Sequence, residues 1–387
     1  QEFWLTIHVP ADAAPGTYRG PVSIEGEGGS WRTTLTLEVL PFTLERNERP
    51  VGMYWHDEPV SGELLDRQIR DMLAHGVTAV TMNLAPEFKN VDGRLVLDTT
   101  ELTAFLRHLR ELGIEGPIPY NPGIEGKVKR AVPDLPFEEA YVEAVRQLQE
   151  VSDRPDTPQL LFYPVDEIGN DEARGASANR QCQLIGRVPG AVSYITVNNY
   201  EAGEKWGDPF DIWCGNIEYT VEQEQRLLAR GKRYMRYGPA YLNDARKART
   251  CAGFGFYRRP AEAMYYWHYQ AYNGDPFNDF DGTARDWCAA YPGPDGELIP
   301  TLDWEGIREG IDDMRYIATV KKLAARAQGG NAAQQAAAQA ALAELDAVLG
   351  MDYGVNQYTY GERLSDEEFH NLRRRLADSI IRLLQVL

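Results

Sequence analysis

Two adjacent carboxylates, Asp166 and Glu167, close an apolar run over residues 160–165. Consecutive apolar residues are typical of a parallel strand covered on both faces, and in parallel α/β barrels catalytic groups gather where strands end. A carboxyl pair at such a place suits general acid and base catalysis, as in cleavage of a glycosidic bond. Because successive strand residues point to opposite faces, both can serve one pocket only if the strand has ended or bulged there. Pro164 favours a bulge.

The alternative use of an Asp-Glu pair is structural. The two side chains could cap the following helix or bind an arginine. The length and composition of the chain favour the catalytic interpretation. A chain of 387 residues suits one large barrel with attachments, and an aromatic content of 11%, with 21 Tyr and 8 Trp, could supply sugar-stacking walls, although these residues also fill large cores.

The net charge of -18 argues against nucleic acid or an anionic membrane as partner, since both demand a basic surface. No stretch is long and apolar enough to span a membrane, and no basic-then-apolar leader stands at the start of the sequence. We therefore expect a soluble protein with no nucleic-acid or membrane partner. Whether it is secreted or cytoplasmic stays open, as does its oligomeric state.

The cysteines and histidines form no pattern typical of a metal or redox site. The four cysteines are widely spaced without a C-x-x-C pair, and the six histidines include no ligand-spaced pair with supporting acids. The glycine after the acidic pair does not match a phosphate-binding loop, and no nucleophile-elbow motif is present. We expect no metal and no cofactor.

Residues 1–46 predict part of a β-sandwich domain. Three strand-like segments, 3–10, 17–25 and 31–42, are separated by turn residues, and a Gly-rich turn joins the last two as a hairpin. Three strands leave exposed edges and too little core for an independent sandwich.

Residues 50–325 predict a (β/α)8 TIM-like barrel of the α/β class, because short apolar runs alternate with amphipathic helices. Glycines Gly76 and Gly113 are expected to end the first two helices. The expected strands are 51–55, 77–83, 118–121, 160–167, 192–198, 211–218 and 233–237, with an eighth in 264–272 or 287–291. Residues 326–387 predict a helical extension, whose last helix starts with a capping box from Ser365 to Glu368.

Three motifs follow one another along the chain. The β-rich start carries Val-Pro-Ala-Asp at 9–12 and Pro-Gly-Thr-Tyr at 15–18, the Asp-Glu pair follows the fourth barrel strand, and Tyr-Pro-Gly at 291–293 precedes a helix start at 304–313. This order resembles glycoside hydrolase family 123, from the start of the chain to about residue 317. The resemblance implies a retaining, exo-acting β-N-acetylgalactosaminidase that uses substrate-assisted catalysis.

By barrel position, the resemblance carries the catalytic pair of the family to Asp166 and Glu167. The 2-acetamido oxygen of the sugar would attack the anomeric carbon to form an oxazoline. Glu167 is then the general acid and later base, and Asp166 orients the acetamido group and stabilises the charge on its nitrogen. The family pair is often followed by proline, whereas Ile168 follows here. An Asp-Glu-Pro string instead occurs at Asp57 and Glu58, where we expect a rim loop or helix start.

Other residues near predicted strand ends are expected to bind the substrate. Amides could read hydroxyl groups, a tyrosine could bond the acetamido carbonyl, and tryptophans could stack on the sugar face. Taken singly, each type also serves as a core or turn residue. The candidates are Trp55, Asn83, Asn199, Tyr200, Asn216, Tyr237, Trp267 and Trp287.

Two alternatives to an exo-β-N-acetylhexosaminidase stay open. A glycosidase on sugars without an acetamido group would pair Glu167 with Glu218 or another carboxylate as nucleophile. A non-catalytic carbohydrate-binding protein would use the same frame without turnover, since one fold hosts many functions. Each alternative keeps a carbohydrate as the partner.

Overall fold

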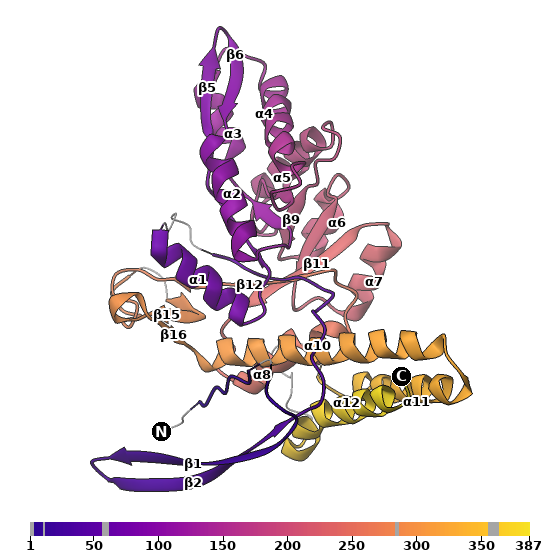
Figure 1. Cartoon of the computed structure of the whole chain (residues 1–387). Helices are drawn as coiled ribbons and strands as arrows, with labels where there is room; N and C mark the ends of the chain where they lie inside the picture. The colour runs from indigo at the N-terminus through magenta and orange to yellow at the C-terminus, as the bar shows by residue number, and fades with distance from the viewer. Residues whose placement is uncertain (1–3, 11, 56–61, 283–285, 355–363) are drawn as a thin grey trace. The chain divides into compact units, whose positions relative to one another are not determined.

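The computed structural model describes residues 4–10, 12–55, 62–282, 286–354 and 364–387 (Figure 1). The chain divides into two compact units. The larger comprises Asn47–Met314 and Asp352–Leu364, and the smaller comprises Gln1–Arg46, Arg315–Met351 and Ser365–Leu387.

Six parallel strands form the main sheet of the larger unit, in the order β4-β3-β12-β11-β10-β9. They are β3 (Val51–Met53), β4 (Ala79–Val80), β9 (Tyr194–Val197), β10 (Ile212–Asn216), β11 (Arg233–Pro239) and β12 (Met264–Trp267). A separate parallel pair is formed by β7 (Ile118–Tyr120) and β8 (Leu160–Phe162). Each of the predicted strands overlaps one of these eight, and the α/β class is confirmed.

Two isolated parallel bridges link the separate pair to the main sheet. Met82, just after β4, pairs with Tyr120, and Phe162 pairs with Ser193, just before β9. Each of the eight strands therefore has a parallel neighbour on both sides. Since the regular sheet has six strands and the remaining links are single bridges, closure into a (β/α)8 barrel stays a prediction.

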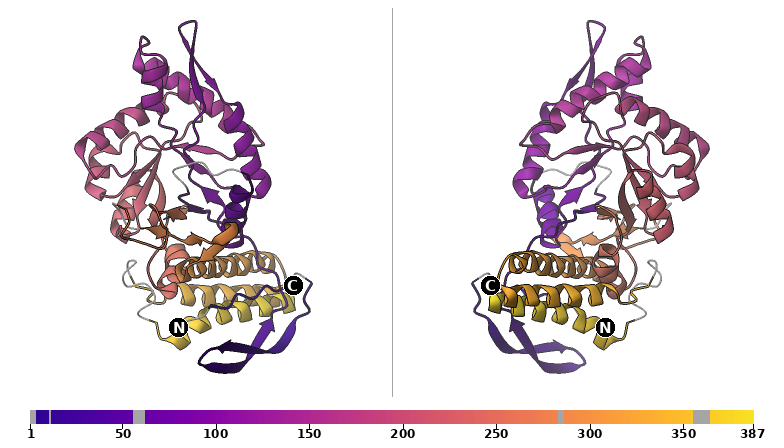
Figure 2. Two further views of the ribbon diagram at one scale, coloured as in Figure 1. Left: turned by 90° about the vertical axis from the view of Figure 1, so that its left-hand side faces the viewer. Right: turned by 90° about the vertical axis from the view of Figure 1, so that its right-hand side faces the viewer.

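Helices of the larger unit surround its strands in both views of Figure 2. They are α1 (Gly62–Ala74), α2 (Thr100–Leu112), α3 (Ile124–Ala131), α4 (Phe137–Ser152), α5 (Glu172–Ile185), α6 (Tyr200–Trp206), α7 (Val221–Ala229), α8 (Ala245–Ala252), α9 (Phe254–Tyr257) and the first part of α10 (Leu302–Gln328). Gly113 caps the end of α2 with a φ of 120°, a conformation that glycine adopts without strain. Gly76, two residues after α1, also has a positive φ, of 82°.

Short antiparallel pairs complete the larger unit. They are β5 (Glu87–Val91) with β6 (Arg94–Asp98), β13 (Gln270–Ala271) with β14 (Trp287–Cys288), and β15 (Ala290–Pro292) with β16 (Leu298–Pro300), the last two joined through a 3-10 turn, η1 (Pro294–Gly296).

The strands are buried because alternate residues serve two cores. One cluster takes Ile212 and Cys214 from β10 and Met235 and Tyr237 from β11. Trp213, between the first two, and Tyr234, next to Met235, belong to the other cluster. Tyrosine rings dominate the first cluster, with Tyr194 in edge contact with its neighbours. This packing brings side chains at the carboxyl ends of the strands toward one place.

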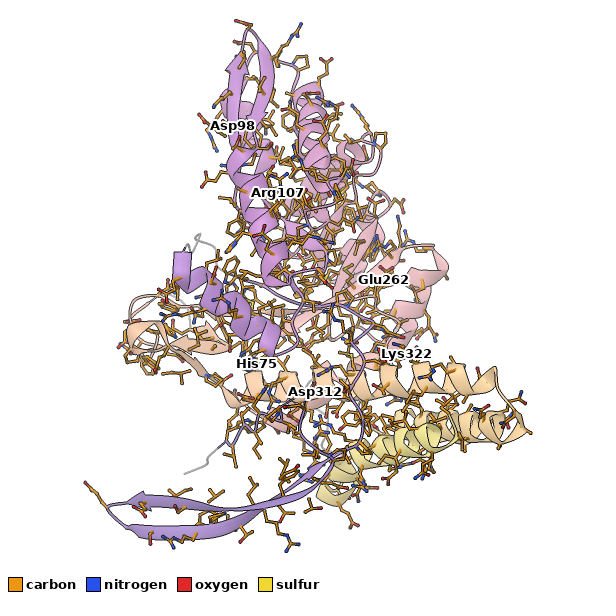
Figure 3. All side chains as sticks on the ribbon, in the orientation of Figure 1. His75, Asp98, Arg107, Glu262, Asp312 and Lys322 are labelled. Atoms are coloured by element: carbon orange, nitrogen blue, oxygen red, sulfur yellow. The ribbon has the colours of Figure 1, made fainter. Side chains whose placement is uncertain are left out.

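The first turn of α10 packs on α1. Figure 3 labels His75, which follows α1, and its ring stacks on Trp304 with centroids 4.3 Å apart. The indole N–H of Trp304 donates to Asp71 Oδ2 at 3.0 Å. The start of α10 is thereby fixed within the larger unit.

The smaller unit contains an antiparallel hairpin, β1 (Gly16–Gly26) and β2 (Gly29–Val39), the later part of α10, α11 (Ala332–Leu349) and α12 (Asp366–Val386). The capping box at the start of α12 is confirmed. The strand expected at 3–10 is wrong for residues 4–10, which are irregular and exposed, because no apolar partner buries them there. The sandwich therefore stays a prediction, and the boundary expected after residue 325 falls inside α10.

None of the described helices combines the length and apolar character needed to cross a bilayer. Within the described ranges, the side chains of His, Cys, Asp and Glu nowhere gather in threes as metal ligands would. All four cysteines are buried free thiols.

Candidate active site

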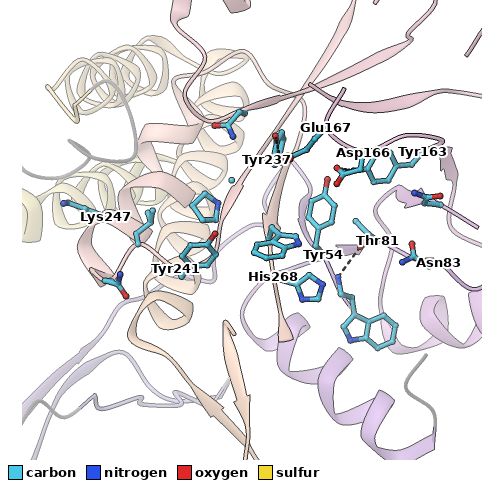
Figure 4. A pocket seen from close by; sticks show the side chains of 18 residues that line it. Tyr54, Thr81, Asn83, Tyr163, Asp166, Glu167, Tyr237, Tyr241, Lys247 and His268 are labelled. Atoms are coloured by element: carbon cyan, nitrogen blue, oxygen red, sulfur yellow. Dashed lines mark hydrogen bonds between the residues drawn. The ribbon is translucent and has the colours of Figure 1, made fainter. Parts of the chain in front are cut away.

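A cavity of about 780 Å³ lies where the parallel strands of the larger unit end (Figure 4). Seven predicted site residues line it, including both carboxylates. The lining residues are Tyr54, Trp55, Thr81, Asn83, Asn121, Tyr163, Asp166, Glu167, Asn216, Tyr237, Gly238, Pro239, Tyr241, Leu242, Asn243, Lys247, Trp267 and His268.

The acidic pair lies on a loop because β8 has already ended at Phe162. Glu167 has a φ of 47°, in the left-handed region that non-glycine residues rarely adopt. This turn of the backbone lets two successive side chains line the same cavity. The sequence requirement that the strand end before the pair is confirmed.

The end of β9 anchors the acidic loop. The N–H of Ile168 donates to the carbonyl of Thr196 at 3.4 Å, and the N–H of Gly169 donates to Asn198 Oδ1 at 2.7 Å. A Cβ atom on Gly169 would lie 2.5 Å from the Cβ of Asn199. Glycine at 169 therefore permits the close approach that holds the loop.

Asp166 is held by two hydroxyl groups on the same oxygen. Thr196 Oγ1 donates to Asp166 Oδ1 at 2.7 Å, and the Tyr163 hydroxyl also donates to that atom. Thr196 Oγ1 in turn accepts the N–H of Glu167 at 2.7 Å. A single buried threonine thus orients one carboxylate through its side chain and the other through its backbone.

Glu167 has a separate set of partners. The Tyr237 hydroxyl donates to Oε1 at 2.9 Å, and Asn170 Nδ2 donates to Oε2 at 3.2 Å. Burial, followed by the nearby Glu167 charge, raises the pKa of Tyr237 far above its ordinary value. The phenol therefore stays protonated and can donate to the carboxyl group at physiological pH.

Side chains of polar character line the part of the cavity near Asp166. The Tyr54 hydroxyl lies 3.1 Å from that of Tyr194, and Thr81 Oγ1 accepts the N–H of Trp55 at 3.2 Å (Figure 4). The Trp55 indole N–H donates to Gln68 at 2.8 Å, and its ring is buried. Trp55 can therefore offer the cavity ring surface, whereas its indole N–H has a protein partner.

An aromatic group forms another part of the wall. Tyr241 packs on Trp287 with ring centroids 3.9 Å apart and lies 6.2 Å from Trp267. Next to Trp267, buried His268 accepts the N–H of Gln270 on Nδ1 at 3.1 Å. The proton of a neutral His268 ring is consequently on Nε2.

Three predicted substrate-binding residues are absent from the lining. Asn199 caps α6 by accepting the N–H of Ala202 at 2.9 Å, so it serves the helix start. Tyr200 is buried against Trp213 and Tyr219. Trp287 lies against Tyr241 and supports a lining residue.

Three other carboxylates were candidates for a catalytic role. Glu218, the alternative nucleophile, is exposed and does not belong to the cavity lining. Its N–H donates to Asn216 Oδ1 at 3.0 Å. Asp57 and Glu58 lie outside the described residues.

Several lining or supporting residues were missed by the sequence analysis. Tyr163 and His268 directly follow β8 and β12, and Tyr54 directly follows β3. Their shared signal is the position just after a strand, where functional residues of parallel barrels concentrate. Thr196, inside β9, gave no such signal. The other lining residues that were not predicted are Thr81, Asn121, Gly238, Pro239, Tyr241, Leu242, Asn243 and Lys247.

Solved structures of other proteins resemble the chain weakly. A GH113 β-mannanase from Alicyclobacillus acidocaldarius has 12% identity and a TM-score of 0.42, covering 71% of this chain and 99% of that one. A family 39 glycoside hydrolase from Bacteroides cellulosilyticus has 11% identity and a TM-score of 0.44, covering 77% and 71%. A β-galactosidase from Bacillus circulans has 9% identity and a TM-score of 0.45, covering 72% and 57%. Scores below 0.5 carry no inference about function.

No curated protein matches the sequence significantly. The sequence model of one protein family, described as the glycoside hydrolase 123 catalytic domain, matches residues 237–320. This segment begins at Tyr237, contains Tyr241, Lys247, Trp267 and His268 of the cavity wall, and does not include the acidic pair. The match confirms the resemblance to glycoside hydrolase family 123 and supports a glycosidase acting on carbohydrate.

Proposed function

We propose that the protein is a retaining exo-β-N-acetylhexosaminidase that favours N-acetylgalactosamine and uses substrate-assisted catalysis. One observation carries the proposal. Asp166 and Glu167 line the same cavity, and the described lining residues include no further carboxylate. A conventional retaining glycosidase needs a carboxylate nucleophile about 5 to 5.5 Å from its acid. Glu218 is not on the cavity, and we assign Asp166, the other carboxylate there, to the amide of the sugar.

In the proposed reaction, Glu167 donates its proton to the glycosidic oxygen as the bond from that oxygen to the anomeric carbon breaks. The carbonyl oxygen of the 2-acetamido group forms the new bond to the anomeric carbon, and Asp166 accepts the hydrogen bond of the amide N–H. Glu167, now a carboxylate, then takes a proton from a water molecule whose oxygen bonds to the anomeric carbon, and the bond from that carbon to the acetamido oxygen breaks. Two inversions at one carbon give retention.

The different partners of the two carboxyl groups support this division of roles. Hydroxyl groups of Tyr163 and Thr196 orient Asp166 through one oxygen, which suits a group that must face a fixed amide. Tyr237 and Asn170 orient Glu167. Asn83, Asn121 and Asn216 are available along the wall for sugar hydroxyls, and Trp267 and Tyr241 for the apolar face of the ring.

The frame that we propose for this site is a (β/α)8 barrel with part of a β-sandwich at its amino-terminal side. The run of parallel pairings through β3, β4, β7, β8, β9, β10, β11 and β12 supports the barrel. The β1–β2 hairpin supports the sandwich portion.

The test compares hydrolysis of aryl β-glycosides of N-acetylgalactosamine, N-acetylglucosamine and galactose. We expect turnover of acetamido sugars alone, and loss of roughly 10²- to 10⁴-fold in kcat for Glu167→Gln. Asp166→Asn should also lose kcat on the acetamido sugars. Glu218→Gln is the matched control and should keep wild-type rates.

A second measurement addresses the attacking group itself. Fluorine atoms on the acetamido methyl group withdraw electrons from the carbonyl oxygen, so kcat should fall stepwise from acetamido to trifluoroacetamido substrates. Equal rates along this series, or turnover of the galactoside that depends on Glu218, would instead indicate a protein nucleophile. Sugar binding without any turnover would indicate a non-catalytic binding protein.

A further inference from the structure

The loop over residues 240–244 joins β11 to α8 and supplies Tyr241, Leu242 and Asn243 to the cavity wall. Its start is fixed because the N–H of Ala240 donates to the carbonyl of Trp267 at 2.7 Å. Its end is fixed because Asp244 caps α8, accepting the N–H groups of residues 246 and 247. Between these points the backbone turns sharply, with Asn243 at a φ of 54°.

Three successive backbone N–H groups of this loop converge on one carboxylate, Asp303. Its Oδ2 accepts from Leu242 at 2.5 Å and from Asn243 at 2.7 Å, and its Oδ1 accepts from Asp244 at 2.8 Å. Successive N–H groups in such a turn form a concave site for an anion, and bonds to a charged acceptor are stronger than neutral ones. Asp303 fills this site and is 6% exposed.

Asp303 is itself held by the first turn of α10. Its neighbour Trp304 is fully buried, stacks on His75 and donates to Asp71. Thr301 Oγ1 accepts the N–H of Trp304 at 3.1 Å. The carboxylate is therefore an anchor whose place does not depend on the loop that it binds.

The loop sets the position of Tyr241. This ring packs on Trp287 at 3.9 Å and faces the edge of Trp267 at 6.2 Å, and in Figure 4 it lies across the drawn cavity from Asp166. An aromatic surface across the cavity from the acidic pair suits the apolar face of a bound sugar. A displaced loop would remove that surface while leaving the acidic pair untouched.

We infer that Asp303 is a positioning residue for the substrate: by binding the amides of residues 242–244, it holds Tyr241 where the ring can pack on the sugar. For the identity of the ligand, this inference rests on the proposed function. Asp303 touches no reacting atom, so its effect falls on substrate binding.

The experiment compares Asp303→Asn with Asp313→Asn. Asp313 is another buried carboxylate of α10, and it bonds the α8 region through Arg249 at 2.6 and 2.9 Å, outside the 240–244 loop. We expect Asp303→Asn to raise KM for the aryl glycoside by roughly tenfold, with kcat changed less than about threefold, as for loss of a charged hydrogen bond in binding. Asp313→Asn should lower the melting temperature and leave KM unchanged.

Amide hydrogen exchange over residues 240–244 gives a readout that needs no substrate. Exchange should accelerate in Asp303→Asn and stay slow in Asp313→Asn. Unchanged exchange, or equal KM values for the two variants, would overturn the inference. If the wild type hydrolyses no glycoside but Asp303→Asn still accelerates exchange over residues 240–244, the proposed function is wrong and the anchoring role of Asp303 stands.

Tyr241→Ala tests the same role of the loop in case Asp303→Asn does not fold. It should raise KM as Asp303→Asn does, and Tyr241→Phe should restore the wild-type value because the ring remains. In a folded double variant, Asp303→Asn should add little to Tyr241→Ala, since both remove the same contact. A wild-type KM for Tyr241→Ala would contradict the role of the loop.

Discussion

The hydroxyl group of Tyr237 donates to Glu167 Oε1 at 2.9 Å, joining residues that are 70 positions apart in the sequence. Tyr237 comes from β11 and Glu167 from the loop after β8, so the bond ties together two separate strand ends of the larger unit. Tyr237 is also the first residue of the segment that matches the glycoside hydrolase 123 catalytic domain. The matched segment and the acidic pair thus meet at one hydrogen bond.

Tyr237→Phe removes only the hydroxyl group that donates to Glu167. A hydrogen bond to a charged group contributes about 1.5–3 kcal/mol, so kcat should fall by roughly 10- to 100-fold, with a smaller change in KM. Steady-state kinetics measure this loss. Tyr265→Phe is the control, because that buried hydroxyl donates to the carbonyl of Pro117 and does not line the cavity. Equal losses in the two variants would show that the Glu167 contact is not the cause.

Thr196→Val keeps the shape of the side chain and removes its hydroxyl group. Asp166 then loses a donor, and the part-buried N–H of Glu167 loses its acceptor. The free energy of unfolding should therefore fall by about 1–3 kcal/mol, and kcat should fall as well. Denaturant unfolding and kinetics test both effects. In Thr157→Val, a buried hydroxyl that donates to Val151 is lost instead, so stability should fall while kcat holds. An unaltered kcat in Thr196→Val would argue against its role in orienting the pair.

Glu224 is fully buried and bonds Arg259 at 2.7 Å and the Tyr234 hydroxyl at 2.9 Å. Removing its charge in Glu224→Gln leaves a buried arginine without its counter-charge, which costs about 3–5 kcal/mol of unfolding free energy. Glu222→Gln on the same helix breaks an exposed pair with Arg226 and should cost at most about 1 kcal/mol. Urea unfolding of the two variants measures this difference in stability. Similar midpoints would contradict a stabilising role of the buried network.

Alkaline pH should unfold the protein through its buried tyrosines. Burial raises the pKa of Tyr54, Tyr163, Tyr194 and Tyr265 well above 10 in the folded chain. The folded state therefore keeps protons that the unfolded state releases above about pH 10, and stability falls as pH rises through that value. Phenolate absorbance at 295 nm should consequently rise together with loss of circular dichroism. Ionisation of all tyrosines with the native spectrum intact would contradict this.

Local patterns predicted the elements that are specified by nearby residues. Short, mostly apolar runs marked the parallel strands, and each of the eight expected strands overlaps an observed one, because burial on both faces favours apolar residues at successive positions. Gly113 marked a helix end, and Ser365 with Glu368 marked a helix start, because caps act within one turn. The strand predicted over residues 4–10 was wrong, since apolar residues form a strand only where a neighbouring strand pairs with them.

The sequence by itself determined that Asp166 and Glu167 follow a buried strand, and its net charge of -18 predicts no nucleic-acid partner. Tertiary structure decided which strand-end residues line the cavity: Asn216 does, whereas Asn199 caps a helix and Trp287 supports Tyr241. It also decided the partners of the acidic pair and the anchor of the 240–244 loop. The bonds that Thr196 and Tyr237 make to the pair, and the bond of Asp303 to Leu242, join residues from 29 to 70 positions apart. Periodicity and capping act over a few residues, so only the packing of distant strands and helices could bring those groups within hydrogen-bond reach.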